Sequence, residues 1–327
     1  MEVFASAIAH PNVALVKYWG KTDWDRNIPA VGSISVTLAN LTTHSTVQFQ
    51  HGLAQDRLFI NQAPAGRHQT LRVSRFLDEI RRRAGIDTFC DVHSVNNFPT
   101  GAGLASSASG FAALSLAASQ AAGLNLDSTE LSALARLGSG SAARSVFGGF
   151  VELTAGEKEG GEPAAFQLHD EHFWPLAVLV AVTTDAPKPF GSREAMAVTE
   201  ARSPYYRSSV QTAAQDIDQM RSAIQRRDLQ SLGETAEHSA LKLHGLLMAS
   251  RPGILYWNGG TFAAIEAVVR MRSEGLAAYF TIDAGPQVKV ICRPQDAPAV
   301  SDRLQALPGI IRVLPCRPGP AARLLEN

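Results

Sequence analysis

Hydrophobic and polar residues alternate in parts of the first fifty positions, a pattern typical of half-buried β-strands. The alternation is clearest at residues 33–38, and residues 42–49 are rich in threonine and valine, which favour strands. Another short strand is predicted at residues 58–61. A helix is predicted at residues 71–84, and we interpret its basic last turn as a solvated helix end rather than a nucleic-acid site. The first part of the chain is therefore predicted to be rich in strands.

The middle of the chain is predicted to pass from a strand at residues 91–96 to an alanine-rich helix at residues 104–122. A shorter helix follows at residues 128–137, with Ser128 as its N-cap. Residues 176–184 have the length and the β-branched composition of a buried strand. This region therefore combines strands with helices.

After about residue 184 the pattern changes to long helices followed by strands. The predicted elements are helices at 203–226, 229–249 and 260–274, strands at 277–282 and 288–292, a helix at 298–307 and a strand at 310–314. A strand-rich first half and a helix-then-strand second half predict an α+β protein. Because 327 residues exceed the size at which one core usually stops growing, we expect two domains, at 1–184 and 185–327.

The composition is that of an ordinary globular protein, with 45% hydrophobic and 18% charged residues. Lys and Arg number 30, as do Asp and Glu, so the formal net charge is zero and argues against nucleic acid or an acidic membrane as partner. The three cysteines are sparse and lack metal-site spacing, which suits a reducing compartment. We expect no signal peptide, and the apolar run at residues 174–182 is too short to span a membrane, so we expect a cytoplasmic protein.

The strongest chemical signal is the sequence NFPTGAGLASSASG at residues 97–110. Gly101 and Gly103 permit backbone conformations that other residues resist. Ser106 and Ser107 stand where a helix begins, and free N–H groups and the helix dipole favour an anion there. We predict a phosphate cradle, although an ordinary Gly/Ser start of a helix would also fit. The segment is neither a Walker A loop nor a Rossmann turn.

Two further segments carry groups that could bind an anion. Lys17 and Lys21 lie at the end of an apolar strand, where they could form a cationic rim for a phosphorylated ligand or mark the edge of a sheet. In residues 138–144, Ser141 and Arg144 are three apart and share a face if the segment is helical. An arginine beside hydroxyl groups suits a carboxylate or a phosphate, but an ordinary loop with a surface arginine also fits.

Three other patterns indicate a binding or catalytic site less specifically. Ser192 and Arg193 stand at the start of a predicted helix and could hold an anion. Asp283 lies between an apolar strand and Ala-Gly-Pro, where a carboxylate often forms a turn but would also be rigidly held for catalysis. His169 and His172 could suggest a metal, but the segment lacks a third ligand at useful spacing, so we predict no metal site.

These blocks occur in the order found in diphosphomevalonate decarboxylases, and the chain resembles that family of the GHMP kinase superfamily from Ala7 to about Ile291. The matching motifs, in chain order, are Asn12 with KYWGK, NNFPTGAGLASS, GSGSAAR, SREAM and DAGP. The resemblance implies a GHMP kinase fold, with an N-terminal nucleotide-binding domain like domain 2 of ribosomal protein S5 and a ferredoxin-like C-terminal substrate domain. It also implies ATP and Mg2+ as cofactors and, as in many family members, a homodimer.

The activity that the resemblance implies is ATP-dependent decarboxylation of mevalonate 5-diphosphate to isopentenyl diphosphate in isoprenoid biosynthesis. Phosphorylation turns the 3-hydroxyl into a better leaving group, and the departing carboxylate supplies the electrons when that phosphate leaves. Such a reaction needs a carboxylate near the hydroxyl, together with cations on the substrate carboxylate and on the phosphates.

By the family pattern, Asp283 would be the base or the orienter of the hydroxyl, and Lys17 would lie beside it and tune its charge. Asn12 and Arg144 would hold the carboxylate and hydroxyl region, and Ser107 would complete the catalytic set. The other residues expected to bind the substrate, chiefly at its 5-phosphate, are Tyr18, Lys21, Ser139, Gly140, Ser141, Ser192, Arg193 and Met196. The residues expected to cradle the ATP phosphates are Asn97, Pro99, Gly101, Ala102, Gly103, Leu104, Ala105, Ser106 and Ser107.

The sequence departs from the family pattern at a few positions. It has Val-Gly-Ser at 31–33 where Asn-Ser-Ser is usual, Thr-Gly-Ala-Gly instead of Thr-Ala-Ala-Gly, and Ala195 instead of Gly. A sister activity, phosphomevalonate decarboxylase, acts on the monophosphate and makes isopentenyl phosphate; retention of Lys21, Ser192 and Arg193 favours the diphosphate. The same motifs would also fit a small-molecule kinase that stops at phosphorylation, or a non-catalytic binding protein on the same fold.

Overall fold

A computed structural model describes residues 4–99, 104–156 and 162–326. The first half of the chain builds a larger and a smaller sheet. The larger has the order β16-β1-β6-β9-β7-β8, with β1 (Phe4–Ala9), β6 (Thr43–Gln50), β7 (Arg57–Ile60), β8 (Ala63–Pro64), β9 (Phe89–Asn96) and β16 (Arg323–Leu324). The smaller has the order β11-β10-β5-β2, with β2 (Asn12–Val16), β5 (Ser33–Thr37), β10 (Phe150–Leu153) and β11 (Ala165–His169). A short antiparallel pair, β3 (Lys21–Asp23) and β4 (Ile28–Pro29), follows β2.

The helices of the first half are α1 (Arg67–Ala84), α2 (Ser106–Ala121), α3 (Ser128–Gly138) and α4 (Ala142–Ser145). Helix α2 consists mostly of alanine and serine, so it can pack closely on β1 and β6, and most of its residues are buried. The cap of α3 differs from the expected Ser128. Asp127 is the N-cap instead, because its carboxylate accepts hydrogen bonds from the backbone N–H groups of Thr129 and Glu130 at 2.8 and 2.9 Å.

The second half places helices on a sheet with the order β13-β14-β12-β15. Its elements are β12 (Ala177–Val182), α5 (Ser192–Arg202), α6 (Tyr206–Arg226), α7 (Leu229–Met248), α8 (Gly259–Ser273), β13 (Ala278–Ile282), β14 (Val288–Cys292), α9 (Ala297–Gln305) and β15 (Arg312–Cys316). All neighbouring strands of this sheet run antiparallel. β12 is buried along its whole length, as its composition predicts.

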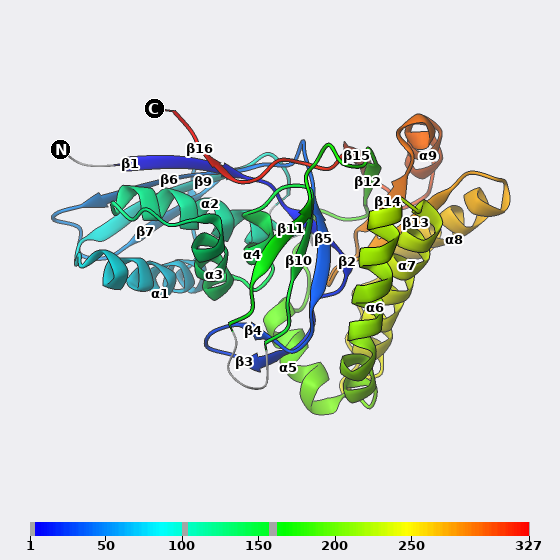
Figure 1. The fold of residues 1–327 in the computed structure, drawn as a ribbon, viewed down its shortest axis with the longest axis horizontal. Helices are drawn as coiled ribbons and strands as arrows, with labels where there is room; N and C mark the ends of the chain where they lie inside the picture. Colours follow the sequence, from blue (N-terminus) through cyan, green and yellow to red (C-terminus); the bar gives the residue numbers. More distant parts are fainter. Residues whose placement is uncertain (1–3, 100–103, 157–161, 327) are drawn as a thin grey trace.

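Strand pairing ties the two halves together at their borders. β12 lies before the expected boundary at residue 184, yet it pairs with β14 and β15 of the second half. β16, close to the C-terminus, pairs with β1, and Figure 1 shows the two chain ends on the same side of the molecule. Hydrogen bonding therefore places the change between the halves before β12 rather than after residue 184, and it returns the last strand to the first half.

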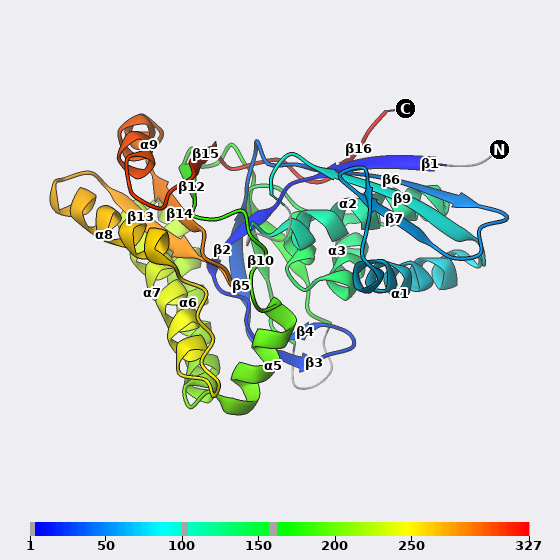
Figure 2. The same cartoon turned by 180° about the vertical axis from the view of Figure 1, so that it is seen from behind.

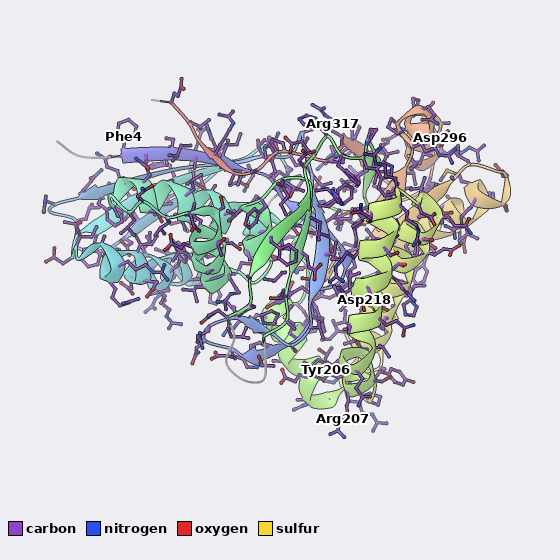
Figure 3. The ribbon with its side chains drawn as sticks, in the orientation of Figure 1. Phe4, Tyr206, Arg207, Asp218, Asp296 and Arg317 are labelled. Carbon is purple, nitrogen blue, oxygen red and sulfur yellow. The ribbon has the colours of Figure 1, made fainter. Side chains whose placement is uncertain are left out.

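A continuous hydrophobic core also joins the halves. Val13 and Ile34 of the smaller sheet share one buried cluster with Met220 of α6 and Leu232 of α7. Figures 1 and 2 show α6 and α7 against the smaller sheet from both sides, and Figure 3 shows side chains filling the space between them. Among the described residues, no helical segment combines the length and hydrophobicity that a membrane span requires.

Candidate active site

Asp283 lies at the junction between the two halves. It follows β13 directly and begins the Ala-Gly-Pro turn at 284–286. A backbone N–H of this turn donates to the carbonyl of Asp283 at 2.7 Å, and Nε2 of His244 on α7 lies 3.1 Å from the same oxygen. The hydroxyl of Thr261 on α8 donates to the carbonyl of Pro286 at 2.7 Å. These contacts fix the backbone that carries the carboxylate.

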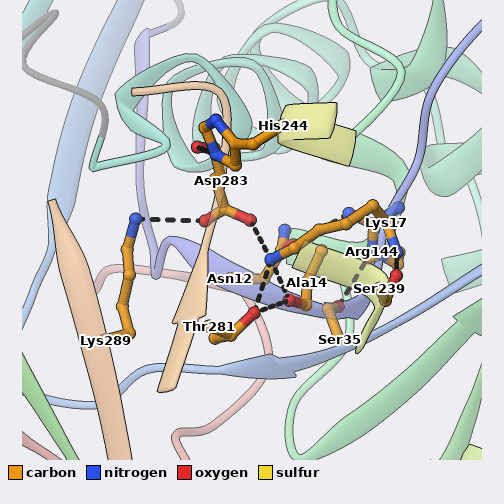
Figure 4. A network of polar contacts seen from close by, with 10 residues as sticks. All are labelled: Asn12, Ala14, Lys17, Ser35, Arg144, Ser239, His244, Thr281, Asp283 and Lys289. Atoms are coloured by element: carbon orange, nitrogen blue, oxygen red, sulfur yellow. Dashed lines mark hydrogen bonds and ion pairs between the residues drawn. The ribbon is translucent and has the colours of Figure 1, made fainter. Parts of the chain in front are cut away.

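Two ammonium groups hold the carboxylate of Asp283 (Figure 4). Lys17 Nζ lies 2.9 Å from Oδ1, and Lys289 Nζ lies 3.2 Å from Oδ2. Both lysines are buried, whereas Asp283 is partly exposed. Burial by itself would raise the pKa of Asp283, but Lys17 and Lys289 outweigh it and hold this pKa well below the ordinary value. The carboxylate is therefore ionised throughout the neutral pH range.

Lys17 connects the smaller sheet to β13. It follows β2, and its Nζ donates to the carbonyl of Ala14 and to the hydroxyl of Thr281, both at 2.6 Å, as well as to Asp283. Its backbone N–H donates to Oγ of Ser239 on α7 at 2.9 Å. Burial lowers the pKa of Lys17 to about 8, although Asp283 acts in the opposite direction. The ammonium group therefore stays mostly protonated at neutral pH.

Arg144 is a buried cation with neutral hydrogen-bond partners. It lies on α4, only 2% of it is exposed, and it stands beside Lys17 in Figure 4. Its guanidinium donates to the hydroxyls of Ser33 and Ser35 at 2.6 and 2.9 Å, and to Oδ1 of Asn12 at 3.1 Å. Burial lowers the pKa of Arg144 to about 10, so it remains charged at neutral pH. The structure thus brings Asn12 and Arg144 together and leaves a positive charge available for an anionic group.

A second group of cations surrounds Asn27. Lys21 Nζ and Arg193 Nη1 both donate to Oδ1 of Asn27, the arginine at 3.1 Å, and both cations lie over the ring of Trp24. Asn27 itself adopts a left-handed backbone, with φ of 53°. Burial and then the charge of Arg193 lower the pKa of Lys21 to about 7. Two cations that share one neutral acceptor favour an anionic ligand, because it would relieve their mutual repulsion.

Three serine hydroxyl groups from the first half lie close to one another. Oγ of Ser139 lies 3.4 Å from Oγ of both Ser107 and Ser141. Tyr18 packs against Gly140 so closely that a Cβ there would lie 2.3 Å from the phenol oxygen, which explains the glycine. The phenol oxygen is buried without a hydrogen-bond partner in the part of the chain that the structure describes. An unsatisfied buried phenol is suited to a ligand that supplies the missing partner.

The N-terminus of α2 is open to an anion. Ser106 and Ser107 are its first residues, its first turn holds no acidic residue, and no side chain within the described ranges caps it. Ala105 precedes it with φ of 56°, a left-handed conformation that is uncommon for a residue with a Cβ. Leu104 is buried beside it. The expected cradle residues Gly101, Ala102 and Gly103 lie outside the described residues.

Asn97 and Met196 were expected to bind ligands, but their contacts in the structure are with the protein itself. The side chain of Asn97 hydrogen-bonds the backbone at residues 40–42, which ties the loop after β9 to the loop before β6. Met196 packs in an apolar cluster with Trp19. Pro99 is partly buried after Asn97. Their expected roles in binding remain predictions.

Sequence reasoning missed three polar residues of this region, namely Lys188, Lys289 and Asn27. Lys188 Nζ donates to Oγ of Ser192 at 2.7 Å and to the carbonyl of Ala284 at 2.9 Å, and burial lowers its pKa to about 8. A lysine between two prolines and a lysine inside an otherwise apolar strand were signals in the sequence. The lysine inside the apolar strand places a charge where solvation is poor, which requires a partner.

Two family models match the chain. The diphosphomevalonate decarboxylase-like N-terminal domain matches residues 9–165, and the mevalonate 5-diphosphate decarboxylase C-terminal domain matches residues 178–311. The second match begins within β12, the strand that pairs into the second half.

Named relatives and solved structures agree with these models. The diphosphomevalonate decarboxylase of Candida albicans is 35% identical over 305 residues, which cover 88% of this chain and 83% of that protein. The phosphomevalonate decarboxylase of Haloferax volcanii is 34% identical over 290 residues, which cover 88% and 87%. The structure of mevalonate diphosphate decarboxylase from Staphylococcus aureus matches with a TM-score of 0.94 and 35% identity, over 100% of this chain and 99% of that chain. A complex of MDDEF with MVAPP, AMPPCP and magnesium matches with the same TM-score and 36% identity over 100% of both chains.

The resemblance drawn from the motifs is thereby confirmed at the level of the whole chain. The two models together cover most of it, and the relatives are similar over more than four fifths of their own length. The chain belongs to the diphosphomevalonate decarboxylase family and has the GHMP kinase fold.

Proposed function

We propose that the protein catalyses the ATP-dependent decarboxylation of mevalonate 5-diphosphate to isopentenyl diphosphate, a step of isoprenoid biosynthesis by the mevalonate pathway. The 3-hydroxyl takes up the γ-phosphoryl group of ATP, and loss of that phosphate together with CO2 leaves the product alkene. The proposal rests chiefly on one arrangement: the ionised Asp283, held by Lys17 and Lys289, lies in the same polar network as the buried Arg144, whose hydrogen-bond partners are neutral.

Asp283 is suited to orient the 3-hydroxyl. A carboxylate has about four acceptor positions, and the two lysines leave some of them for the proton of the hydroxyl. Its lowered pKa makes Asp283 a weak base at neutral pH. Its main contribution would therefore be to aim the hydroxyl oxygen, and to accept the proton only as the new P–O bond forms. Of the two roles that the sequence left open, the two ion pairs favour the orienter, because they lower the pKa of the carboxyl group and so its basicity.

Arg144 and Asn12 are suited to hold the substrate carboxylate. The buried guanidinium has lost much of its hydration, and its neutral partners do not cancel its charge. A carboxylate fixed by this group keeps the C–C bond that breaks aligned with the developing empty orbital on C3. Alignment of reacting groups is a large part of enzymatic rate enhancement, so Arg144 should act on the decarboxylation step itself.

ATP and Mg2+ are the cofactors of this reaction, and a structural neighbour was solved with AMPPCP and magnesium. The uncapped start of α2 at Ser106 and Ser107 fits the phosphates of ATP. Within the described ranges, no group of three or more His, Cys, Asp or Glu side chains could hold a metal ion alone. Mg2+ would thus be bound mainly by phosphate oxygens, with the hydroxyl of Ser107 available beside them, and would neutralise charge on the transferring phosphoryl group.

The central test is to incubate the protein with ATP, Mg2+ and either mevalonate 5-diphosphate or mevalonate 5-phosphate. We expect one CO2 and one ADP per turnover, with isopentenyl diphosphate identified by mass spectrometry as the product from the diphosphate. A kinase that stops at phosphorylation would form ADP without CO2, and a non-catalytic protein would form neither. Preference for the monophosphate would make the protein a phosphomevalonate decarboxylase instead.

Arg193→Ala should raise the KM for mevalonate 5-diphosphate by about 10- to 100-fold, because charge-assisted contacts with the terminal phosphate would be lost. The rise in KM should be smaller for mevalonate 5-phosphate, so the ratio of kcat/KM for the diphosphate to kcat/KM for the monophosphate should decrease. Steady-state kinetics with both substrates on both proteins measure this. Arg202→Ala is the matched control, since Arg202 lies at the other end of α5 and its guanidinium donates to the backbone carbonyl of Arg251 at 3.3 Å. Equal losses for the two substrates would contradict a role at the terminal phosphate.

Ser107→Ala should lower kcat by about 10- to 100-fold while changing the Kd of ATP by no more than about threefold. The backbone N–H groups at the start of α2 stay in place and keep most of the phosphate binding. The hydroxyl should matter mainly as charge shifts during phosphoryl transfer. Nucleotide titration and single-turnover ADP formation separate the two quantities. Ser128→Ala, at the start of α3, is the control; weakened ATP binding with unchanged kcat would refute this role.

We further propose that the protein is a homodimer in the cytoplasm. The family resemblance supports the dimer, and the three cysteines support the compartment, since Cys90, Cys292 and Cys316 are free and buried. Light scattering on the purified protein measures the oligomeric state directly. A monomer mass at concentrations used for activity assays would remove the dimer from the proposal.

A further inference from the structure

Lys289 is a buried charge in a strand that is otherwise apolar. The other residues of β14 are Val, Val, Ile and Cys, and Lys289 itself is 3% exposed. The strand register pairs it with Thr281 of β13 and with Val180 of β12. A buried ammonium group costs free energy unless a partner offsets its desolvation. The partner in contact is Oδ2 of Asp283, at 3.2 Å.

Lys289 and Lys17 reach the carboxylate from opposite sides, as Figure 4 shows. Lys17 is itself fixed by Ala14 and Thr281, so its contact with Oδ1 anchors one oxygen of Asp283. The last torsion of an aspartate side chain has a broad energy profile, so the orientation of the carboxylate depends on the charged groups around it. Lys289 adds an ion pair to Oδ2, an oxygen that has no hydrogen-bond partner among the described residues, so its positive charge attracts the second oxygen from the other side.

We propose that Lys289 is a positioning residue for the decarboxylation reaction, which fixes the plane of the Asp283 carboxylate and supplies the second positive charge that offsets its burial. The inference rests on the proposed function, because it gives Asp283 its role toward the 3-hydroxyl. Lys289 acts through Asp283 and needs no contact with the substrate.

Several other ionisable groups face the carboxylate or its backbone: Lys17, Arg144, Lys188 and His244. Burial and the charge of Lys17 lower the pKa of His244 to about 3, so this side chain is neutral. Burial raises the pKa of Asp283, and the charges of Lys17 and Lys289 lower it. When Lys289 is removed, mainly Lys17 is left to oppose the effect of burial. The pKa of Asp283 should therefore rise. Because the active form is the carboxylate, activity should then be lost as the pH falls, and retained at higher pH.

The test compares Lys289→Met, which removes the charge at similar size, with Lys289→Arg, which keeps it. kcat/KM for CO2 release is measured between about pH 5 and pH 9. The value for each variant is divided by the value for the unmutated enzyme at the same pH, which cancels the effect of ionisation of the substrates. We expect Lys289→Met to lose about 10- to 100-fold at the alkaline end, and its ratio to fall further toward acid pH. Lys289→Arg should give a ratio that does not vary with pH.

Lys242→Met is the matched control, because Lys242 also pairs with a buried aspartate, Asp216, outside the site. A merely structural role for Lys289 predicts that Lys289→Met lowers the melting temperature as the control does, without a loss of kcat that Lys289→Arg restores, and this result would overturn the inference. If Lys289→Met does not fold, Lys289→Gln gives the same comparison with a neutral polar side chain. Absence of CO2 release by the unmutated enzyme would refute the proposed function instead.

Discussion

Asp283→Asn should lower turnover by at least about a thousandfold while ATP still binds, since the loss falls on a group that acts in the transition state. The amide is almost isosteric with the carboxylate, but it carries no charge and cannot accept the proton of the 3-hydroxyl. It also leaves the ammonium groups of Lys17 and Lys289 without their shared counter-charge. CO2 release measures turnover, and nucleotide titration measures ATP binding.

The control for this variant is Asp216→Asn, which also removes a buried aspartate that is paired with a lysine, Lys242. It should lower the melting temperature without a comparable loss of turnover. The pair of variants therefore separates damage to the fold from damage to the reaction. Retention of more than about a tenth of normal turnover by Asp283→Asn would remove Asp283 from the mechanism.

Arg144→Met should have the second largest effect, a loss of about 100- to 1000-fold in kcat/KM, which corresponds to the cost of removing one partner from a buried charged contact. It should also change the stoichiometry of the reaction. If Arg144 aligns the carboxylate for departure, its loss should slow decarboxylation more than phosphorylation, so ADP should form in excess of CO2. Measurement of both products in one reaction detects this uncoupling.

Ser33→Ala offers a graded comparison for Arg144→Met. It removes one of the three side-chain contacts of the guanidinium, at 2.6 Å, and keeps the charge. The loss of kcat/KM should therefore be much smaller, of the order of tenfold for one hydrogen bond to a charged group. Arg144→Met with a CO2-to-ADP ratio of one would show that Arg144 serves binding alone.

The sequence predicted those site residues whose role follows from their immediate neighbours in the chain, and it missed those whose role depends on distant segments. Asp283, Lys17 and Arg144 stand in short motifs, and the strand before Asp283 was predicted at residues 277–282, where β13 covers Ala278–Ile282. Lys289 gave only a weak signal, because its meaning depends on the register between β13 and β14. Asn27 gave none, since a short polar segment does not show which cations its side chain will contact.

The fold shows the same limit. The composition of residues 176–184 predicted a buried strand, but a strand pattern does not specify its neighbours. β12 precedes the expected boundary at residue 184 although it pairs with strands that follow it, and the pairing of β16 with β1 could not be foreseen, because it joins segments separated by almost the whole chain. Non-local pairing of this kind is set by tertiary packing rather than by local sequence preference.

The core that Val13 and Ile34 share with Met220 and Leu232 has a consequence for how ligands enter and leave. Opening of two domains by a rigid-body rotation requires an interface that can separate. Here separation would expose buried apolar side chains and break the contacts of Lys17 with Thr281 and Asp283. Separation of the two halves at this junction would therefore cost free energy. A movement that leaves this core packed would cost less free energy than separation of the two halves.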